Sequence, residues 1–292
     1  MSKTKKAVII GSVLVGIGVI IGFIGIAIGG FKFPNGAVDL TTMKALHAEK
    51  KTVQIADAFD KIEIAGASSM DIEICKSKTG KNYVEYYDTD DWTSHVDVKD
   101  HVLKFTTDDK GKHKAIVSLG FGKDTAARLY LADAEYKEIA VTTLSGYVTI
   151  QDVNAGTVNV SASSGDLYMK NINAPDSIMA SSSSGDIDLE NATAKQIELG
   201  ANSGDIEMQD ITAESLRMST SSGDIDLESC DAEKFDITTS SGDVDMEITA
   251  GRTYRFETKT NSGAVDVPDG DADSEYLCKI VTSSGDVDVK QK

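Results

Sequence analysis

Residues 183–189 read Ser-Ser-Gly-Asp-Ile-Asp-Leu, and close copies of this stretch recur through the second half of the chain. The Ser-Gly pair occurs eight times after residue 140, and successive glycines are 19 to 22 residues apart. Self-similarity at such a period is the mark of a repeat architecture. The eight pairs are Ser145-Gly146, Ser164-Gly165, Ser184-Gly185, Ser203-Gly204, Ser222-Gly223, Ser241-Gly242, Ser262-Gly263 and Ser284-Gly285.

Most copies contain two short segments in which every second residue is apolar. One segment precedes the glycine, as in Leu216 and Met218, and the other follows it, as in Ile225 and Leu227. Alternation with a period of two indicates strands, and no sustained i, i+3, i+4, i+7 pattern favours helices. The repeating unit is therefore predicted to be a strand, a Ser-Gly turn, a second strand and an alanine-containing corner.

One such unit cannot cover its own apolar face, so neighbouring units must stack. The sequence predicts an all-β fold, a β-solenoid of 19–22-residue two-strand coils. At about 4.8 Å per coil, eight coils extend for roughly 38 Å. Glycine at the turn is attributed to a backbone position with positive φ, and the preceding serines are expected to hydrogen-bond locally or along the stack.

The chain before the repeats is less regular. Residues 136–292 carry the regular Ser-Gly-Asp solenoid, whereas residues 53–135 are expected to form an irregular β-rich section that caps it. Within that section, residues 68–74 resemble one degenerate copy with Met70 at the glycine position. Residues 29–52 are assigned to a juxtamembrane spacer.

Three further segments are distinctive beside the serial Ser-Ser-Gly-Asp-Ile/Val-Asp turns. They are Phe59-Asp60-Lys61-Ile62-Glu63-Ile64, Val102-Leu103-Lys104-Phe105 and Arg128-Leu129-Tyr130-Leu131. In these motifs the chain resembles, over roughly residues 53–290, the bacterial cell-envelope proteins with a toast-rack-like β-repeat domain that are named the putative adhesin family. The resemblance implies a β-solenoid, a location in the cell envelope and no catalytic residues.

The N-terminus contains an uncharged apolar run of 22 residues, Ala7 to Ile28. As a helix it would be about 33 Å long, enough to cross a bilayer core. The lysines of residues 1–6 predict a cytoplasmic tail and an extracytoplasmic C-terminal domain, in a single-pass protein of the cell membrane. A cleaved signal peptide is the alternative, although its apolar stretch is usually about 7–15 residues and ends at an A-x-A-like site.

The same run contains two G-x-x-x-G spacings, which let two membrane helices approach closely and would favour a homo-oligomer. The glycines concerned are Gly18, Gly22, Gly25 and Gly29. Glycine is also simply common in membrane helices, so this spacing has a second explanation.

The chain is acidic, with 47 Asp and Glu against 29 Lys and Arg and a net charge of −18. This balance argues against a nucleic-acid partner, which requires clustered basic residues. Carboxylates form two outward columns, on either side of the apolar residue that follows each turn. In a stack in register, like charges would lie about 5 Å apart and repel by about 0.8–3.3 kcal/mol per pair at effective dielectric constants of 20–80.

Three explanations of these columns remain open. The first carboxylate of each copy accepts backbone N–H groups in the turn while the second is solvated. Alternatively, the columns bind Ca²⁺ weakly, although the paired-glycine signature of calcium β-rolls is absent. The third explanation is a cationic partner, a basic peptide or an envelope component. The calcium candidates are Asp186, Asp188, Asp205, Glu207, Asp224, Asp226, Asp243 and Asp245.

No motif points to catalysis. All four histidines (His47, His95, His101 and His113) precede the regular repeats, and no G-x-S-x-G motif is present. A polysaccharide-acting site of the kind found on other β-solenoids would appear as a local, basic break in the pattern, and the largest break is Arg252–Lys259. The chain is therefore predicted not to be an enzyme, and no cofactor is assigned.

The three cysteines are predicted to stay unpaired. Cys230 and Cys278 fall at inward positions about two coils apart, roughly 10 Å, which is too far for a disulfide. Cys75 follows an inward residue and is expected to be exposed.

The last copy ends on a strand at residues 287–289. An open last coil would leave backbone groups free to accept a strand from another protein. The sequence thus predicts a membrane-anchored extracytoplasmic β-solenoid that acts as a non-catalytic surface binding, adhesion or envelope-sensing module. The alternatives are a self-associating structural scaffold of the envelope and a polysaccharide-acting β-helix enzyme.

Overall fold

The computed structural model describes residues 32–33, 36–37, 49–66, 70–88, 92–109, 126–249 and 251–292. The expected cytoplasmic tail, membrane helix and packing glycines lie outside these residues, as does most of the expected spacer. In the described parts of the chain, no helix has the length and apolarity needed to span a membrane.

The described residues form strands and no helix, which confirms the all-β prediction for this part of the chain. A separate antiparallel pair consists of β1 (Lys32–Phe33) and β2 (Gly36–Ala37). The first section of the solenoid contains β3 (Glu49–Gln54), β4 (Lys61–Ala65), β5 (Ile72–Lys76), β6 (Tyr83–Asp88), β7 (Trp92–Lys99), β8 (Val102–Asp109) and β9 (Ala127–Leu131). The repeats contain β10 (Glu135–Ser145), β11 (Val148–Ser164), β12 (Leu167–Ser184), β13 (Ile187–Ser203), β14 (Ile206–Ser222), β15 (Ile225–Ser241), β16 (Val244–Ile248), β17 (Arg255–Lys259), β18 (Val265–Asp266), β19 (Leu277–Val281) and β20 (Val287–Gln291).

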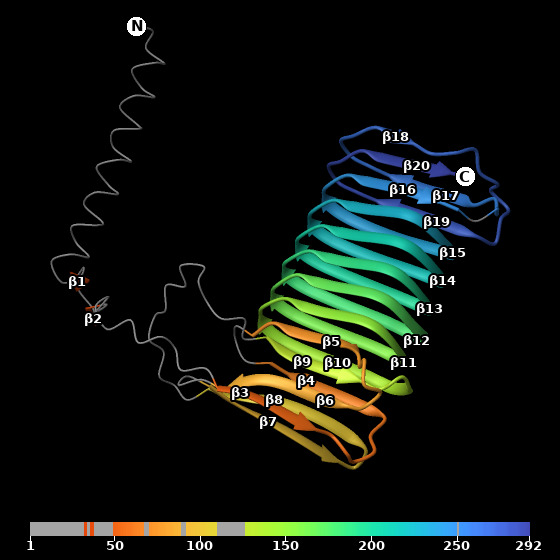
Figure 1. Cartoon of the computed structure of the whole chain (residues 1–292). Coiled ribbons are helices and arrows are strands. Elements are labelled where there is room, and N and C mark those ends of the chain that lie inside the picture. The colour runs from red at the N-terminus through yellow and green to blue at the C-terminus, as the bar shows by residue number, and fades with distance from the viewer. Residues whose placement is uncertain are drawn as a thin grey trace, which may run out of the picture. The chain divides into compact units, whose positions relative to one another are not determined.

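The repeats stack as parallel coils in register, so the predicted β-solenoid is confirmed (Figure 1). Ile187 pairs with Ile206, which pairs in turn with Ile225 on the next coil. The inward residues of both faces are fully buried, as with Leu216 and Phe235. Each such side chain contributes about 1.5–3 kcal/mol of hydrophobic stabilisation relative to exposure.

The second corner of each coil differs from the sequence prediction. Each of β11 to β15 runs through this corner as one long strand, because a single residue in the left-handed conformation turns the chain without ending the ladder. This residue lies six positions after the turn glycine and is Asp152, Asn171, Asn191, Asp210 or Ser229, with φ between 52° and 56°. Asn and Asp tolerate this conformation best among residues with a side chain, which explains the column.

The turn glycines are required chiefly by close approach rather than by positive φ alone. A Cβ built on Gly223 would lie 2.6 Å from the carbonyl carbon of Gly204 and closer still to its oxygen. Gly204, Gly223 and Gly242 have no φ in the left-handed region, yet a Cβ on each would overlap the carbonyl of the equivalent glycine on the preceding coil. The missing side chain is what lets consecutive turns stack.

The irregular section continues both faces of the solenoid. On one face, β4 pairs with β10 and is followed by β8 and the antiparallel β7. On the other face, β5 pairs with β11 and with β9, both in parallel. Strand β6 then pairs antiparallel with β9, and β3 pairs antiparallel with β6. Met70 is buried and occupies the glycine position, as predicted, because its carbonyl lies under Gly146.

The far end of the solenoid contradicts the predicted open last coil. Cys278 of β19 pairs with Phe235 on one side and with Phe256 of β17 on the other. Likewise, Val287 of β20 lies between Val244 of β16 and Val265 of β18. The last coil in the sequence (277–291) is therefore inserted between its two predecessors, and the coil of residues 255–266 is outermost (the blue end in Figure 1).

Burial explains this order. The inserted coil carries Cys278, Ile280, Val287 and Val289 inward, and all four are buried. The outermost coil is more polar, and its Val265 is 42% exposed. Placing the more apolar coil inside leaves less hydrophobic surface in water. The longer glycine spacings at the end of the chain, 21 and 22 residues, allow the chain to skip one coil and return.

Candidate functional site

Acidic side chains gather in one open groove, which we call the acidic groove, on the solenoid face that follows the Ser-Gly turns. The groove has a volume of about 430 Å³ and crosses β12 to β16 and β20. Eight carboxylates and a single lysine, Lys290, line it. The carboxylates are those of Asp188, Glu190, Glu207, Asp226, Glu228, Asp245, Glu247 and Asp288.

The first Asp column lies beside this groove and is explained by turn chemistry. Oδ1 of each of these aspartates accepts the backbone N–H of the equivalent residue on the next coil, at 2.7–3.0 Å. The N–H of Asp224, for example, donates to Asp205 Oδ1 at 2.8 Å. The prediction that these carboxylates accept turn N–H groups is thus confirmed, with the donor on the neighbouring coil.

The second column forms the exposed floor of the acidic groove and accumulates unfavourable charge. Partial burial raises the pKa of the Asp226 carboxyl, and the carboxylates of Asp245 and Glu207 raise it further. The pKa of Asp188 is raised for the same reasons, burial first and then Glu207. Repulsion along the column is therefore present in the folded protein.

Cations neutralise the two ends of the acidic groove and not its centre. Lys170 lies 2.5 Å from Glu190 at one end, and Lys290 lies 3.2 Å from Asp288 at the other. Within the described part of the chain, Glu207, Asp226 and Asp245 form no ion pair. The centre of the groove is thus an uncompensated anionic surface in the absence of a bound ligand.

The calcium candidates are divided between two roles. Those of the first column have one carboxylate oxygen engaged by a neighbouring N–H, while those of the second column point into the acidic groove. Across the described residues, no three His, Cys, Asp or Glu side chains are grouped in a way that could hold a metal ion. Weak calcium binding stays one of the three explanations of the acidic columns, and no cofactor is assigned.

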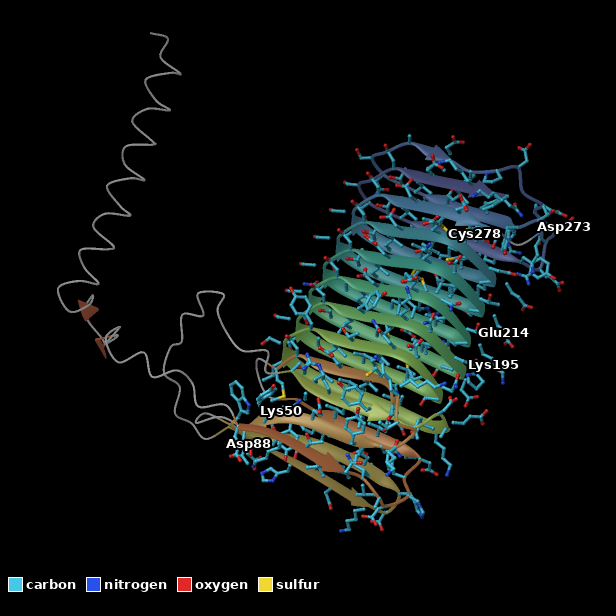
Figure 2. The ribbon with its side chains drawn as sticks, viewed as in Figure 1. Lys50, Asp88, Lys195, Glu214, Asp273 and Cys278 are labelled. Atoms are coloured by element: carbon cyan, nitrogen blue, oxygen red, sulfur yellow. The ribbon has the colours of Figure 1, made fainter. Side chains whose placement is uncertain are left out.

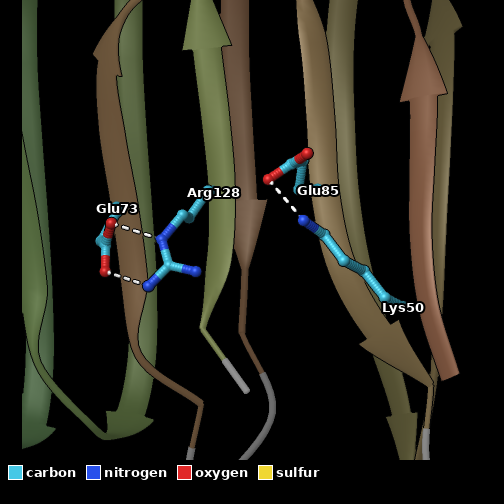
Figure 3. A network of polar contacts seen from close by, with 4 residues as sticks. All are labelled: Lys50, Glu73, Glu85 and Arg128. Atoms are coloured by element: carbon cyan, nitrogen blue, oxygen red, sulfur yellow. Dashed lines mark hydrogen bonds and ion pairs between the residues drawn. The ribbon is translucent and has the colours of Figure 1, made fainter. Parts of the chain in front are cut away.

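A contrasting polar network lies in the first section of the solenoid (Figure 3). The guanidinium of Arg128 donates to both carboxylate oxygens of Glu73, at 2.7 and 3.0 Å, and Lys50 pairs with Glu85 at 3.0 Å. These residues lie on adjacent strands, so each carboxylate has its own cation. The network is neutralised and stabilises strand pairing, in contrast to the acidic groove.

The remaining chemically interesting residues do not converge. His95 lies 3.2 Å from Asp108 on the exposed β7–β8 hairpin, and His101 is in the turn of that hairpin, while His47 and His113 lie outside the described residues. The sequence break at Arg252–Lys259 forms the outermost coil and its connection, which is why it departs from the repeat.

The cysteines are free, as predicted. Cys230 and Cys278 are fully buried, and burial raises the pKa of both thiols to about 12, so they are unreactive core residues. Cys278 lies on the coil next to that of Cys230 rather than two coils away, because its coil is inserted. Cys75 is half-buried rather than exposed.

Sequence reasoning missed the left-handed corner residues and the strand order. The corner had a signal, since Asp or Asn recurs six residues after five of the eight turn glycines. These side chains form their own ladder, in which Asn191 Nδ2 donates to Asn171 Oδ1 at 2.7 Å and Asn171 Nδ2 donates to Asp152 Oδ1 at 2.6 Å.

Fold and site together define a stacked-coil β scaffold that presents one repeated acidic face. Residues 59–290 match the family described as Toastrack DUF4097, and the chain belongs to that family. A comparison with curated proteins gives no match.

Solved structures agree with this fold. One, a "putative adhesin" from Bacteroides fragilis, has 17% identity and a TM-score of 0.52, and the match covers 84% of this chain and 97% of that one. A second, a "putative lipid binding protein" from Parabacteroides distasonis, has 19% identity and a TM-score of 0.52, covering 83% and 96% respectively. At these identities the likeness shows the fold alone.

Proposed function

We propose that this protein is a non-catalytic binding module displayed outside the cell membrane, and that its acidic groove binds a cationic partner such as a basic peptide or a cationic envelope component. The observation that carries this proposal is the uncompensated centre of the groove. There, Glu207, Asp226 and Asp245 are held on a rigid, in-register β face. A partner that supplies several positive charges at a spacing of about 5 Å would relieve this repulsion.

The location is part of the same proposal. The apolar run of residues 7–28, preceded by three lysines, is of the length and polarity expected of a single N-in membrane helix. Such an anchor would hold the acidic face outside the cell, where adhesion or envelope sensing takes place. The structurally similar protein from Bacteroides fragilis is named a "putative adhesin", which is compatible with this role.

The test is a binding titration of the full chain in detergent with a short oligolysine peptide at two salt concentrations. We expect saturable binding that weakens several-fold as the ionic strength rises, because screening shortens the reach of the groove's charges. Binding that is absent at low salt would refute the proposal.

A matched pair of variants assigns the binding to the groove. Glu207 and Glu214 lie on the same strand, β14, but Glu207 lines the acidic groove whereas Glu214 lies at the corner edge, beside Lys195 (Figure 2). Glu207→Gln and Glu214→Gln remove the same charge. We expect only Glu207→Gln to weaken oligolysine binding by more than about twofold. Equal losses would show that the net charge, not the groove, attracts the peptide.

A further inference from the structure

The inserted coil occupies a slot that the preceding coils form on both sides. One wall is residues 234–248 and the other is residues 255–266, and the inserted coil (277–291) hydrogen-bonds to both. At the turn, Gly242 N–H donates to Ser284 O at 3.0 Å, and Gly285 N–H donates to Ser262 O at 3.0 Å. The slot thus holds the inserted coil by strand pairing on both sides, over residues 277–281 and 287–288.

The two walls are also complementary to each other. Phe235 and Phe256 both align with Cys278, while Val244 and Val265 both align with Val287. If the inserted coil leaves, the walls can therefore pair directly in the same register. Its release then costs one coil-to-coil interface rather than two.

The connection that leads into the inserted coil has the features of a hinge. Residues 267–276 contain no strand and are mostly exposed, and Asp273 lies at the edge of the molecule (Figure 2). Few backbone contacts tie this connection to the preceding segment. Asp271 N–H donates to Tyr254 O at 3.0 Å, Ser274 Oγ donates to Thr253 O at 2.6 Å, and Arg255 N–H donates to Tyr276 O at 2.8 Å, where the Arg252 guanidinium also lies 5.2 Å from the centre of the Tyr276 ring. Exchange of an identical element between copies requires such a hinge and no new interface.

We propose that the C-terminal coil, residues 277–291, exchanges between two copies of this chain, so that the coil of each copy fills the slot of the other. The partner is a second copy because the slot's side-chain fit, with Cys278, Ile280, Val287 and Val289 buried, is made by this very sequence. The resulting dimer is held by two complete inserted coils. This proposal does not depend on the ligand of the acidic groove, and the exchanged coil would carry the groove residues Asp288 and Lys290 with it.

Cysteine pairs on the outward face report the exchange directly. Asp245 and Asp288 are cross-strand neighbours, whereas Asp266 lies on the far side of Asp288 and one coil further from Asp245. In a Cys75→Ser background, full-length chains carrying Asp245→Cys and differently tagged full-length chains carrying Asp288→Cys are co-expressed, extracted in detergent and oxidised. The control co-expresses Asp245→Cys with Asp266→Cys.

We expect a disulfide-linked heterodimer from the Asp245→Cys and Asp288→Cys chains, at least fivefold more abundant than from the control pair. A heterodimer yield equal to the control would overturn the exchange, provided that one chain carrying both substitutions forms the internal disulfide. If that doubly substituted chain forms no disulfide, monomeric or dimeric, the inserted register itself is refuted, and the exchange falls with it.

Discussion

The glycine column offers the sharpest test of how the coils stack. In Gly223→Ala, the new methyl group would overlap the Gly204 carbonyl, with its carbon 2.6 Å from the carbonyl carbon. Real Cβ atoms do not approach backbone atoms this closely, so the stacked turns at Gly204 and Gly223 must separate locally.

The cost follows from the contacts at this turn. Separation stretches the bonds from Gly204 N–H to Ser222 O (3.2 Å), from Ile206 N–H to Asp224 O (3.0 Å) and from Asp224 N–H to Asp205 Oδ1 (2.8 Å). Two or three lost hydrogen bonds at about 1 kcal/mol each, plus about 1–3 kcal/mol of overpacking, give a loss of about 3–6 kcal/mol. With an m-value of about 2–3 kcal/mol/M in urea, the unfolding midpoint should fall by about 1–3 M.

Gly200→Ala is the matched control. A Cβ on Gly200 would meet only Ser219, at 3.6 Å from Oγ and 4.0 Å from the carbonyl oxygen, which are ordinary contacts, and its φ is not in the left-handed region. This variant should be within about 1 kcal/mol of the parent, or slightly more stable, because alanine restricts the unfolded chain. Urea unfolding of the full chain in detergent, followed by circular dichroism, compares the two. Equal midpoints for Gly223→Ala and Gly200→Ala would refute the close-approach explanation.

Four further predictions concern the acidic columns and the end of the solenoid. Asp205→Ala removes the acceptor of the Asp224 N–H and should lower the unfolding free energy by about 0.5–1.5 kcal/mol in the same urea assay, whereas Asp205→Asn, which keeps an acceptor oxygen, should lose less. The pKa of Asp226 is raised in the folded state, so protonation of this carboxylate favours folding. Asp226→Asn should therefore be more stable than the parent chain at neutral pH, and this advantage should shrink as the pH falls through the raised pKa and be gone below about pH 4. A stability advantage of Asp226→Asn that persists in acid would contradict this reasoning. Tyr254→Phe leaves the buried carbonyl of Ala232 without its 2.6 Å donor and should cost about 1–3 kcal/mol in thermal unfolding, with no loss expected if water reaches that carbonyl. Millimolar calcium should leave the melting temperature unchanged, because one oxygen of each first-column carboxylate already accepts an N–H; several bound ions with a clear rise in melting temperature would reverse this conclusion.

Much of the fold could be predicted from local pattern because a stacked coil repeats the same environment. Alternation with a period of two indicates which residues face inward, and the equal spacing of glycines places equivalent residues above one another. The buried column of Ile187, Ile206 and Ile225 is a direct consequence. The candidate site was accessible in the same way, since outward Asp and Glu residues at one repeat position must form a column.

Other features depend on contacts between stacked coils and on backbone conformation, which the sequence pattern does not show. Positive φ was a reasonable explanation of the turn glycines, but Gly204 and Gly223 are glycine because a neighbouring carbonyl fills the space of a side chain. The left-handed corner at Asn191 follows the same logic. The recurring Asn or Asp at this position can be recognised in the sequence, whereas its left-handed backbone conformation, which turns the chain at the corner, is seen only in the structure.

The sequence by itself therefore determined the period, the inward and outward residues, the parallel register and the acidic face of this protein. Only the tertiary structure decided the order of the last coils and the reason for the glycine column. The physical reason is that every coil presents the same register to every other coil, so local pairing energies scarcely distinguish one stacking order from another. The order is settled by total burial, which places Ile280 and Val287 inside and leaves the more polar coil of residues 255–266 facing water.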